Sequence, residues 1–458
     1  MSIEIKFLGA ARSVTGSCHL VRVGEQTLLL DCGQIQGSHL DEDLNRVPLP
    51  VGRVDAVVLS HAHIDHSGRL PLLRKQGFSG PIYTHRASRD LCEIMLRDAA
   101  YLHEKDAEWQ NKKLSRKGLA HVAPLYTRDD AQAVLGQFAP LEYGARQRIL
   151  PGVEVRLQNA GHILGAAIVE LWLEDAGRSV KLVFSGDLGY AHAVVLEPPT
   201  PIDEADVVLM ESTYGDRDHR PFDSTLRELE SIIRGATDAG GNILIPAFAV
   251  GRTQDLLYLL AEHYEAWKLE RWQIYLDSPM AIETTELYWR YRDLQKHGLF
   301  RDGRKPQLAN VIASQTTEDS MRINETRSGA IVIAGSGMCN GGRIMQHLKH
   351  NLWRPECHVV LVGFQAQGTL GRRLVDGAEH VRLWHETIKV AAQIHTVGGL
   401  SAHADRSGLL GWYGAFKNKP PVCLVHGEPT AQQALADGLK EKFGADVRIP
   451  ARGESLVL

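Results

Sequence analysis

The sequence has few cysteines, and none of them form a Cys-x-x-Cys pair. The six lie scattered at positions 18, 32, 92, 339, 357 and 423 of a chain of 458 residues. Closely spaced cysteines are typical of structural zinc sites and of disulfide-rich secreted scaffolds. The pattern therefore argues against a cysteine metal site and favours reduced thiols in the cytoplasm.

The sequence also lacks long hydrophobic runs. No stretch approaches the roughly 20 apolar residues that a membrane-spanning helix needs. The N-terminal stretch "MSIEIKFLGAARSVTG" alternates like a β-strand and lacks the basic, apolar and small-residue regions of a secretory signal. We therefore expect a cytoplasmic protein without a membrane partner.

An excess of positive charge is absent as well. The chain carries 51 Lys and Arg against 55 Asp and Glu, a formal net charge of −4. This balance excludes a protein coated in positive potential. It does not exclude a nucleic-acid substrate, because a local basic groove or a metal ion can bind phosphates within an acidic whole.

The pattern of elements changes along the chain. The length predicts two or three domains. The first two hundred residues are mostly strand-like, with a hairpin turn at Gly24 and Glu25 and helices expected over residues 69–75 and 88–113. The second helix runs into the basic segment "NKKLSRKG", which we expect to be exposed.

Beyond about Glu211 the strands alternate with helices, as in "GGNILIPAF", "GRTQDLLYLLAEHYEAW" and "WQIYLD". Such alternation predicts a parallel sheet flanked by helices and a separate domain. The last 70 or so residues return to short strands, of which "PPVCLVHGE" is the clearest.

A dense group of metal-ligand side chains follows an early apolar strand, in "SHAHIDHSG". His61 and His63 lie two apart, so an extended backbone directs them to one side. Asp65 and His66 then lie in a turn and can face a second ion. Imidazole and carboxylate are natural ligands of zinc and similar divalent ions. Without partners their burial would cost several kcal/mol each, so a packed core is excluded.

Three more polar residues follow apolar strands: His162, Asp187 and His426. Each alone is more typical of a hydrogen-bonded loop residue, but together they complete the six or seven ligands that two ions need. Asp187, with two oxygens, is the natural bridge. If His426 is a ligand, the end of the chain must return to the first cluster, and the middle segment is an insertion.

These residues resemble the metallo-β-lactamase superfamily, whose fold is a four-layered αβ/βα sandwich. Asp31 in "LLLDCG" matches an early aspartate that supports the metal site from behind the ligands. The segments "LMESTYGDRDH", "GGLSAHAD" and "CLVHGEP" resemble motifs A, B and C of the β-CASP branch, which holds RNA-processing nucleases. The resemblance implies an α/β protein with a metallo-β-lactamase domain over 1–212, an inserted parallel-sheet β-CASP domain over 213–388, and a return segment over 389–458.

The resemblance also implies a ligand set. One ion would be held by His61, His63 and His162, the other by Asp65, His66 and His426, with Asp187 bridging. Two Zn²⁺ are implied, with Mn²⁺ as the alternative.

The resemblance further implies a mechanism of phosphodiester hydrolysis. Two ions about 3.5–4 Å apart can lower the pKa of a water between them toward about 7 and neutralise a phosphate. Glu211 corresponds to motif A and His403 to motif B. His403 is expected to protonate the leaving ribose oxygen. Glu211 is expected to orient the imidazole of His403, and Asp65 is expected to orient the attacking hydroxide.

Two glycine-rich turns suggest where a polymer binds, "AFAVGRTQ" and "AGSGMCNGGR". Each joins a strand to a helix, so its amides can receive phosphates, and Arg252 and Arg343 lie close by. Close packing of helix on strand explains the glycines equally well. We expect a cleft for single-stranded RNA between the two domains, with Ser336 and Met338 lining it if the resemblance holds.

Several alternatives remain open. DNA-acting members of the branch typically carry valine at motif C, where this chain has His426, which favours RNA. Small-molecule hydrolases of the fold need neither the insertion nor the "SAHAD" motif, and diiron redox members usually have glutamate at the position of His63. A non-enzymatic scaffold is disfavoured because every ligand position is filled. The resemblance leaves a homodimer open, as well as endo- against exonuclease action.

Overall fold

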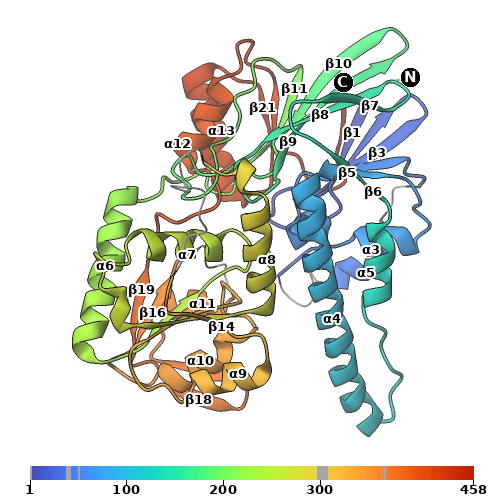
Figure 1. The fold of residues 1–458 in the computed structure, drawn as a ribbon. Coiled ribbons are helices and arrows are strands. Elements are labelled where there is room, and N and C mark those ends of the chain that lie inside the picture. The colour runs from blue at the N-terminus through green and yellow to red at the C-terminus, as the bar shows by residue number, and fades with distance from the viewer. Residues whose placement is uncertain (1–2, 38–42, 50–51, 297–307, 364, 366–367) are drawn as a thin grey trace. The chain divides into compact units, whose positions relative to one another are not determined.

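The computed structural model describes residues 3–37, 43–49, 52–296, 308–363, 365 and 368–458. The chain divides into two compact units (Figure 1). The first unit contains residues 1–191, 198–218 and 403–458, and the second contains residues 192–197 and 219–402. In the structure the second unit ends later than the boundary at residue 388 expected from the sequence, because strand β19 (Gln393–Thr396) pairs with its sheet.

Two seven-stranded sheets form the first unit. One has the order β22-β1-β2-β3-β4-β5-β6 and the other β21-β20-β11-β10-β9-β8-β7. The first sheet consists of β1 (Glu4–Gly9), β2 (Cys18–Val23), β3 (Gln26–Leu30), β4 (Ala56–Val58), β5 (Ile82–His85), β6 (Phe138–Leu141) and β22 (Ser455–Val457). The second consists of β7 (Arg146–Leu150), β8 (Val153–Asn159), β9 (Ala167–Asp175), β10 (Arg178–Phe184), β11 (Val207–Glu211), β20 (Val422–Val425) and β21 (Val447–Arg448).

One apolar core joins these two sheets. It contains fully buried side chains such as Ile5 and Leu30 from the first sheet and Leu171 and Leu209 from the second. Alternate residues of each strand point into this core, as the period of two in an extended chain requires. The predicted hairpin is confirmed, because β2 and β3 are joined by Gly24 and Glu25 alone.

Helices lie against the outer faces of the sandwich. The helices are η1 (Leu44–Arg46), α2 (Ile64–Ser67), α3 (Leu70–Lys75), α4 (Arg86–Arg116), α5 (Arg128–Leu135), α12 (Arg406–Gly414) and α13 (Pro429–Phe443). Helices α3, α4 and α5 pack together, and α4 contacts β5 and β6, whereas α13 contacts β20, β21 and α12. The predicted four-layered αβ/βα architecture is therefore confirmed.

Helix α4 is longer than the expected 88–113. It starts at Arg86 because the Nδ1 atom of His85 accepts a hydrogen bond from the amide of Ala87 and caps the first turn. It continues to Arg116, so most of the basic segment "NKKLSRKG" is helical.

The second unit is built on a parallel six-stranded sheet of order β14-β13-β15-β12-β16-β19, as the alternation of strands and helices predicted. Its other strands are β12 (Ile243–Pro246), β13 (Gln273–Asp277), β14 (Val311–Ala313), β15 (Ala330–Ala334), β16 (His358–Leu361), and the hairpin of β17 (His380–Leu383) and β18 (Glu386–Lys389). Its helices are α6 (Phe222–Ala239), α7 (Arg252–Glu262), η2 (Leu269–Arg271), α8 (Pro279–Arg290), η3 (Arg292–Leu294), α9 (Thr317–Ile323), α10 (Ile344–Asn351) and α11 (Leu370–Val375).

Apolar clusters cover both faces of this sheet. A parallel sheet buried on both sides needs such continuous apolar strands. Among the described helices, none has the length and hydropathy that crossing a bilayer requires.

Candidate metal centre

The sequence-predicted ligands all follow strands whose ends meet. In the second sheet of the first unit, β10, β11 and β20 are parallel neighbours, so their carboxyl ends lie at one edge. Asp187, Glu211 and His426 lie at or just after these ends. In the first sheet, β3 and β4 are also parallel neighbours, and the "HAHIDH" segment follows β4. Parallel pairing thus gathers these residues at one edge of each sheet, and the packing of the two sheets on one apolar core brings residues more than 350 positions apart together.

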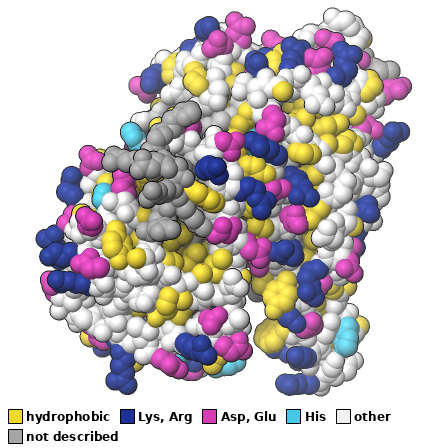
Figure 2. All heavy atoms as spheres, in the orientation of Figure 1, with side chains coloured by type: hydrophobic (Ala, Val, Ile, Leu, Met, Phe, Trp, Pro, Cys, Tyr) yellow, Lys and Arg dark blue, Asp and Glu magenta, His cyan; other side chains and the backbone are white. Residues whose placement is uncertain are grey.

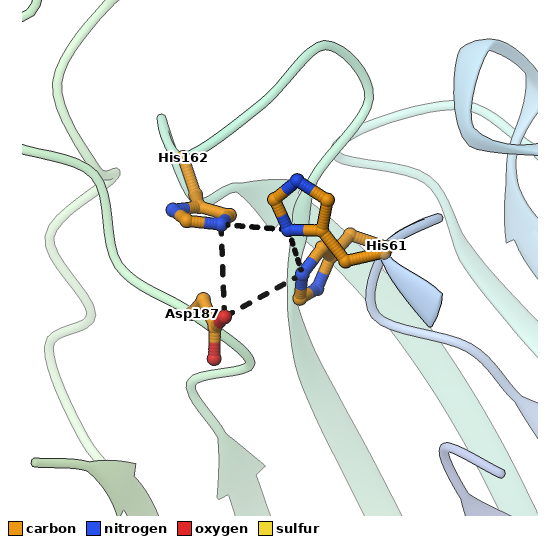
Figure 3. A group of neighbouring side chains, drawn as sticks. His61, His162 and Asp187 are labelled. Atoms are coloured by element: carbon orange, nitrogen blue, oxygen red, sulfur yellow. Dashed lines mark hydrogen bonds and ion pairs between the residues drawn. The ribbon is translucent and has the colours of Figure 1, made fainter. Parts of the chain in front are cut away.

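Three histidines and an aspartate form the first cluster (Figure 3). The Nδ1 atom of His63 lies 3.2 Å from Nε2 of His61 and 3.1 Å from Nε2 of His162. The Oδ2 atom of Asp187 lies 3.5 Å from Nε2 of His61 and 3.6 Å from Nε2 of His162. Four potential ligand atoms therefore face a common point.

Asp65, His66 and His426 form the second cluster. The Nε2 atoms of His66 and His426 are 3.2 Å apart. The Oδ2 atom of Asp65 lies 3.4 Å from Nε2 of His426. The Oδ2 atom of Asp187 is 3.3 Å from Nε2 of His66, so the same carboxylate oxygen borders both clusters. The structure brings together all seven residues that the sequence singled out.

The donor set fits divalent metal ions. Ligand atoms bound tetrahedrally at 2.0–2.1 Å would be about 3.4 Å apart, close to the distances found in the first cluster. The Oδ1 atom of Asp187 is buried and has no hydrogen-bond partner among the described residues, although Nδ1 of His426 is 3.5 Å away. A buried carboxylate with an unsatisfied oxygen is costly unless a cation completes it.

Ionisation states in the centre favour metal binding. Burial lowers the pKa of His61 well below its usual range, which keeps the ring neutral. Burial raises the pKa of Asp187, but the surrounding histidines, His426 and His66 foremost, outweigh this effect and leave it well below its usual range. Neutral imidazole and ionised carboxylate are the forms that bind zinc.

His66 differs from the other ligands. Burial lowers its pKa, but the carboxylates of Asp187, Asp65 and Asp31 outweigh burial and raise the pKa well above the usual range. A cation therefore replaces a proton at this ring when it binds, as expected for a metal site rich in negative charge.

A buried carboxylate supports the second cluster from behind, as the resemblance implied for Asp31. Its Oδ2 atom lies 2.7 Å from Nδ1 of His66, which leaves Nε2 of that ring directed at the cluster. The same carboxylate accepts hydrogen bonds from the amide of Ser60 at 2.8 Å and from the hydroxyl of Ser17 at 3.0 Å.

Two hydroxyl groups that sequence reasoning missed orient further ligands. The Oγ atom of Ser60 lies 3.0 Å from Nδ1 of His61, and Oγ1 of Thr213 lies 3.1 Å from Nδ1 of His426. Ser60 directly precedes the first ligand, and Thr213 lies within the motif A segment. A hydroxyl next to a ligand-bearing strand end is the signal that could have identified them.

His403 and Glu211 form a pair beside the clusters. The Nδ1 atom of His403 is 3.1 Å from Oε1 of Glu211, and its Nε2 atom is 4.0 Å from Oδ2 of Asp187. Glu211 is fully buried and also accepts hydrogen bonds from the amides of Leu188 and Thr213. Glu211 therefore holds the Nδ1 atom of His403, and the Nε2 atom lies on the side of Asp187. The imidazole is 21% exposed.

The electrostatics of this pair favour a protonated imidazole. Burial lowers the pKa of His403, but the charge and hydrogen bond of Glu211 outweigh burial, and Asp187 adds to the effect. The pKa rises to about 9. At neutral pH the ring therefore carries a proton that it can donate.

The expected RNA-contacting residues lie in the second unit, on turns that follow β12 and β15. The guanidinium of Arg343 donates to Asp277 and to the carbonyls of Ser314 and Gln315, and the buried Arg252 donates to Asp255. Both arginines thus hold their turns in place.

Ser336 and Met338 lie half-buried in the second of these turns. The hydroxyl of Ser336 accepts a hydrogen bond from the amide of Asn340. A Cβ at Gly342 would lie 2.3 Å from the carbonyl oxygen of Gly335, so close packing requires glycine there. At Gly342 the glycine is therefore explained by close packing. Phosphate binding by the two turns stays a prediction.

Three family models match the chain. They are the metallo-beta-lactamase superfamily over residues 12–239, the Beta-Casp domain over 253–374, and the Zn-dependent metallo-hydrolase RNA specificity domain over 387–450.

Similar proteins include Ribonuclease TTHA0252 of Thermus thermophilus, which is 40% identical over 98% of both chains. Transcription termination factor FttA of Pyrococcus abyssi is 32% identical, over 98% of this chain and 70% of its own. A crystal structure of a protein of unknown function from Enterococcus faecalis matches the whole chain with a TM-score of 0.56 at 14% identity, which supports the fold alone.

A glycine behind the second cluster offers a test of this geometry. A Cβ at Gly33 would lie 1.6 Å from the carbonyl oxygen of Asp65, whose turn carries two ligands. We expect Gly33→Ala to displace that turn and to weaken the binding of added zinc at least tenfold in calorimetric titration. Gly136→Ala, whose Cβ would meet nothing nearer than 3.7 Å, is the matched control and should bind zinc as the unaltered protein does. Unchanged zinc binding in Gly33→Ala would contradict the placement of the Asp65–His66 turn.

Proposed function

Since the chain belongs to the β-CASP family of ribonucleases with the metallo-β-lactamase fold, we propose that it hydrolyses phosphodiester bonds of single-stranded RNA at the candidate metal centre. The observation that supports this most is the proton-donor pair of His403 and Glu211 beside seven convergent metal-ligand side chains. A metal centre alone is common to many hydrolases of this fold. A protonated histidine that is held in position beside the centre can also protonate a leaving alkoxide, as hydrolysis of a phosphodiester requires.

We propose that the centre holds two ions. One ion would be held by His61, His63 and His162. The other would be held by Asp65, His66 and His426, and Asp187 would bind both ions. Histidine-rich sites with carboxylates suit Zn²⁺, with Mn²⁺ as the alternative. When bound, such ions lower the pKa of water and neutralise the charge of the phosphate.

His403 would act as general acid. Its Nδ1–H is directed to Glu211, and its Nε2–H, on the side of Asp187, would protonate the ribose oxygen that leaves. The buried carboxylate of Glu211 fixes the ring orientation and stabilises the imidazolium, as the aspartate does for histidine in other hydrolases. A placed general acid contributes roughly 10²- to 10⁴-fold in rate.

Asp65 would help to orient the attacking water. Its carboxylate is 20% exposed, so it borders the open side of the centre. Burial raises its pKa, but His66 and His426 outweigh burial and lower the pKa to about 2. The group is therefore ionised and accepts hydrogen bonds at neutral pH.

The second unit would bind the RNA strand. Ser336, Met338 and the backbone amides of the two glycine-rich turns would contact the polymer. Because Arg252 is engaged by Asp255 of its own helix and Arg343 by Asp277 at the end of β13, these arginines would contribute mainly by holding the turns in place.

The alternatives are weaker. Of the similar proteins, one carries the name ribonuclease, which favours RNA over DNA. The second unit, with its own six-stranded sheet and core, has no evident use in a small-molecule hydrolase. The finding that all seven ligand side chains converge disfavours a non-enzymatic scaffold.

The substrate class can be tested with single-stranded RNA and DNA oligonucleotides of the same sequence. We expect the zinc- or manganese-loaded protein to cleave the RNA faster, and chelation of the metal to abolish cleavage. The sizes of labelled products distinguish endo- from exonuclease action. Faster hydrolysis of the DNA would contradict the proposal.

The general acid can be tested with His403→Ala. We expect the variant to retain the metal content of the unaltered protein, measured by elemental analysis, and to lose about 10²- to 10⁴-fold in the rate of RNA cleavage. His380→Ala, which removes an exposed histidine of β17, is the control and should lose neither. Loss of metal from His403→Ala would instead make His403 a ligand.

A further inference from the structure

The outer half of α4 is largely free of packing partners. At about 1.5 Å per residue, its 31 residues span about 46 Å. Most of the apolar residues between Ala87 and Ala100 are buried, but from Tyr101 to the end of the helix only Ala107 is. The segment that follows the helix folds back along it, with Val122 bound to Asn111 by two hydrogen bonds. Figure 1 shows this end of α4 projecting from its unit.

Five exposed side chains share one face of this outer half. They are Trp109, Lys112, Lys113, Arg116 and Lys117, referred to below as the basic face. Their spacing of three, four, seven and eight residues places them on one side of a helix. The indole of Trp109 is 59% exposed, and the Nζ atom of Lys113 lies 3.1 Å from its ring centroid. In Figure 2 dark-blue and yellow side chains occur together at the far end of α4.

The charge of the basic face is not neutralised nearby. From Trp109 to Arg128 the sequence contains no Asp or Glu. Arg128 itself pairs with Glu104, at 2.8 Å. No ion pair joins the four cations of the basic face to a carboxylate within the described parts of the chain. In a chain of net charge −4, such a local concentration of positive charge fits a polyanion.

We propose that the basic face is a second binding site for single-stranded RNA, distinct from the metal centre. The inference rests on the proposed function. Cations in a row meet successive phosphates, and an exposed aromatic ring stacks on bases of any sequence. The contact with Lys113 holds the indole beside the cations, so one nucleotide can use both kinds of contact.

The position of the basic face indicates which substrates it would affect. The first turn of α4 contacts the loop that carries His162, because Ser88 Oγ donates to the carbonyl of Gly165 at 2.7 Å. Trp109 lies 21 residues farther on than Ser88, or about 32 Å along the helix. A stacked strand rises about 3.4 Å per nucleotide, so about nine nucleotides separate the two sites. Long RNAs would therefore use the basic face, and short ones would not.

Other occupants fit this face less well. A second copy of the chain that met this face with its own basic face would present the same four positive charges and would repel it. A membrane surface requires a broad apolar stripe beside the cations, and this face has one bulky apolar residue.

The test compares two variants of the whole chain that each lose four positive charges at different places, and a third variant that loses the indole. The first variant neutralises the basic face as Lys112→Gln/Lys113→Gln/Arg116→Gln/Lys117→Gln. The matched control removes four other exposed cations of the first unit as Arg53→Gln/Arg74→Gln/Lys440→Gln/Lys442→Gln. A third variant is Trp109→Ala.

Binding is measured by fluorescence anisotropy with a long labelled RNA in EDTA, and cleavage is measured on long and short RNAs with metal. Since single strands contribute about 0.7 per neutralised phosphate, we expect the first variant to reduce the slope of log Kd against log salt by about 3. Trp109→Ala should weaken binding of the long RNA about tenfold. Both should raise KM for the long RNA only, and the control should behave as the unaltered protein.

Equal salt slopes for the basic-face variant and its control, with folding confirmed by circular dichroism, would overturn the inference. Loss of self-association, or loss of binding to anionic lipid vesicles, with unchanged RNA affinity would overturn it too. If the unaltered protein cleaves no RNA, the proposed function fails by itself. If the unaltered protein and every variant cleave short RNA equally and no variant loses affinity for long RNA, only the proposed role of the basic face is refuted.

Discussion

A single buried carboxylate, that of Asp187, holds the site together. Ring nitrogens of four histidines, His61, His66, His162 and His426, lie within 3.6 Å of its two oxygens. Burying an ionised carboxylate costs several kcal/mol unless positive charge surrounds it. The fold therefore has to deliver imidazoles from both sheets to one point, and the apolar core between the sheets keeps those strand ends facing one another.

The insertion of the second unit is compatible with this constraint because the chain on either side of it is hydrogen-bonded within the first unit. The chain returns at His403, which forms a bridge with Gly189, two residues after the shared carboxylate, and the amide of Ala404 donates to the carbonyl of Leu188. The amide of His426 donates to the carbonyl of Ala10. Backbone hydrogen bonds thus hold together, within the first unit, segments that are far apart in the sequence.

The sequence predicted which side chains converge because most of them follow an apolar strand, and a polar side chain at a strand end has access to the sheet edge. It predicted less well what depends on side-chain contacts. The hydroxyls of Ser60 and Thr213 were missed although each lies next to a strand end, because serine and threonine occur in many such turns without a metal site beside them. The engagement of Arg343 by Asp277 was equally hidden, since 66 residues separate them. The domain limits depended on the pairing of β19, which no local pattern reveals.

The measurement that tests the account most directly is a crystal structure of the protein with zinc, using anomalous scattering to locate the metal. The account predicts two peaks per chain, one among His61, His63 and His162 and one among Asp65, His66 and His426, with Asp187 bound to both. A single peak, or a peak coordinated by Glu211 and His403, which also form a potential ligand group with Asp187, would contradict it.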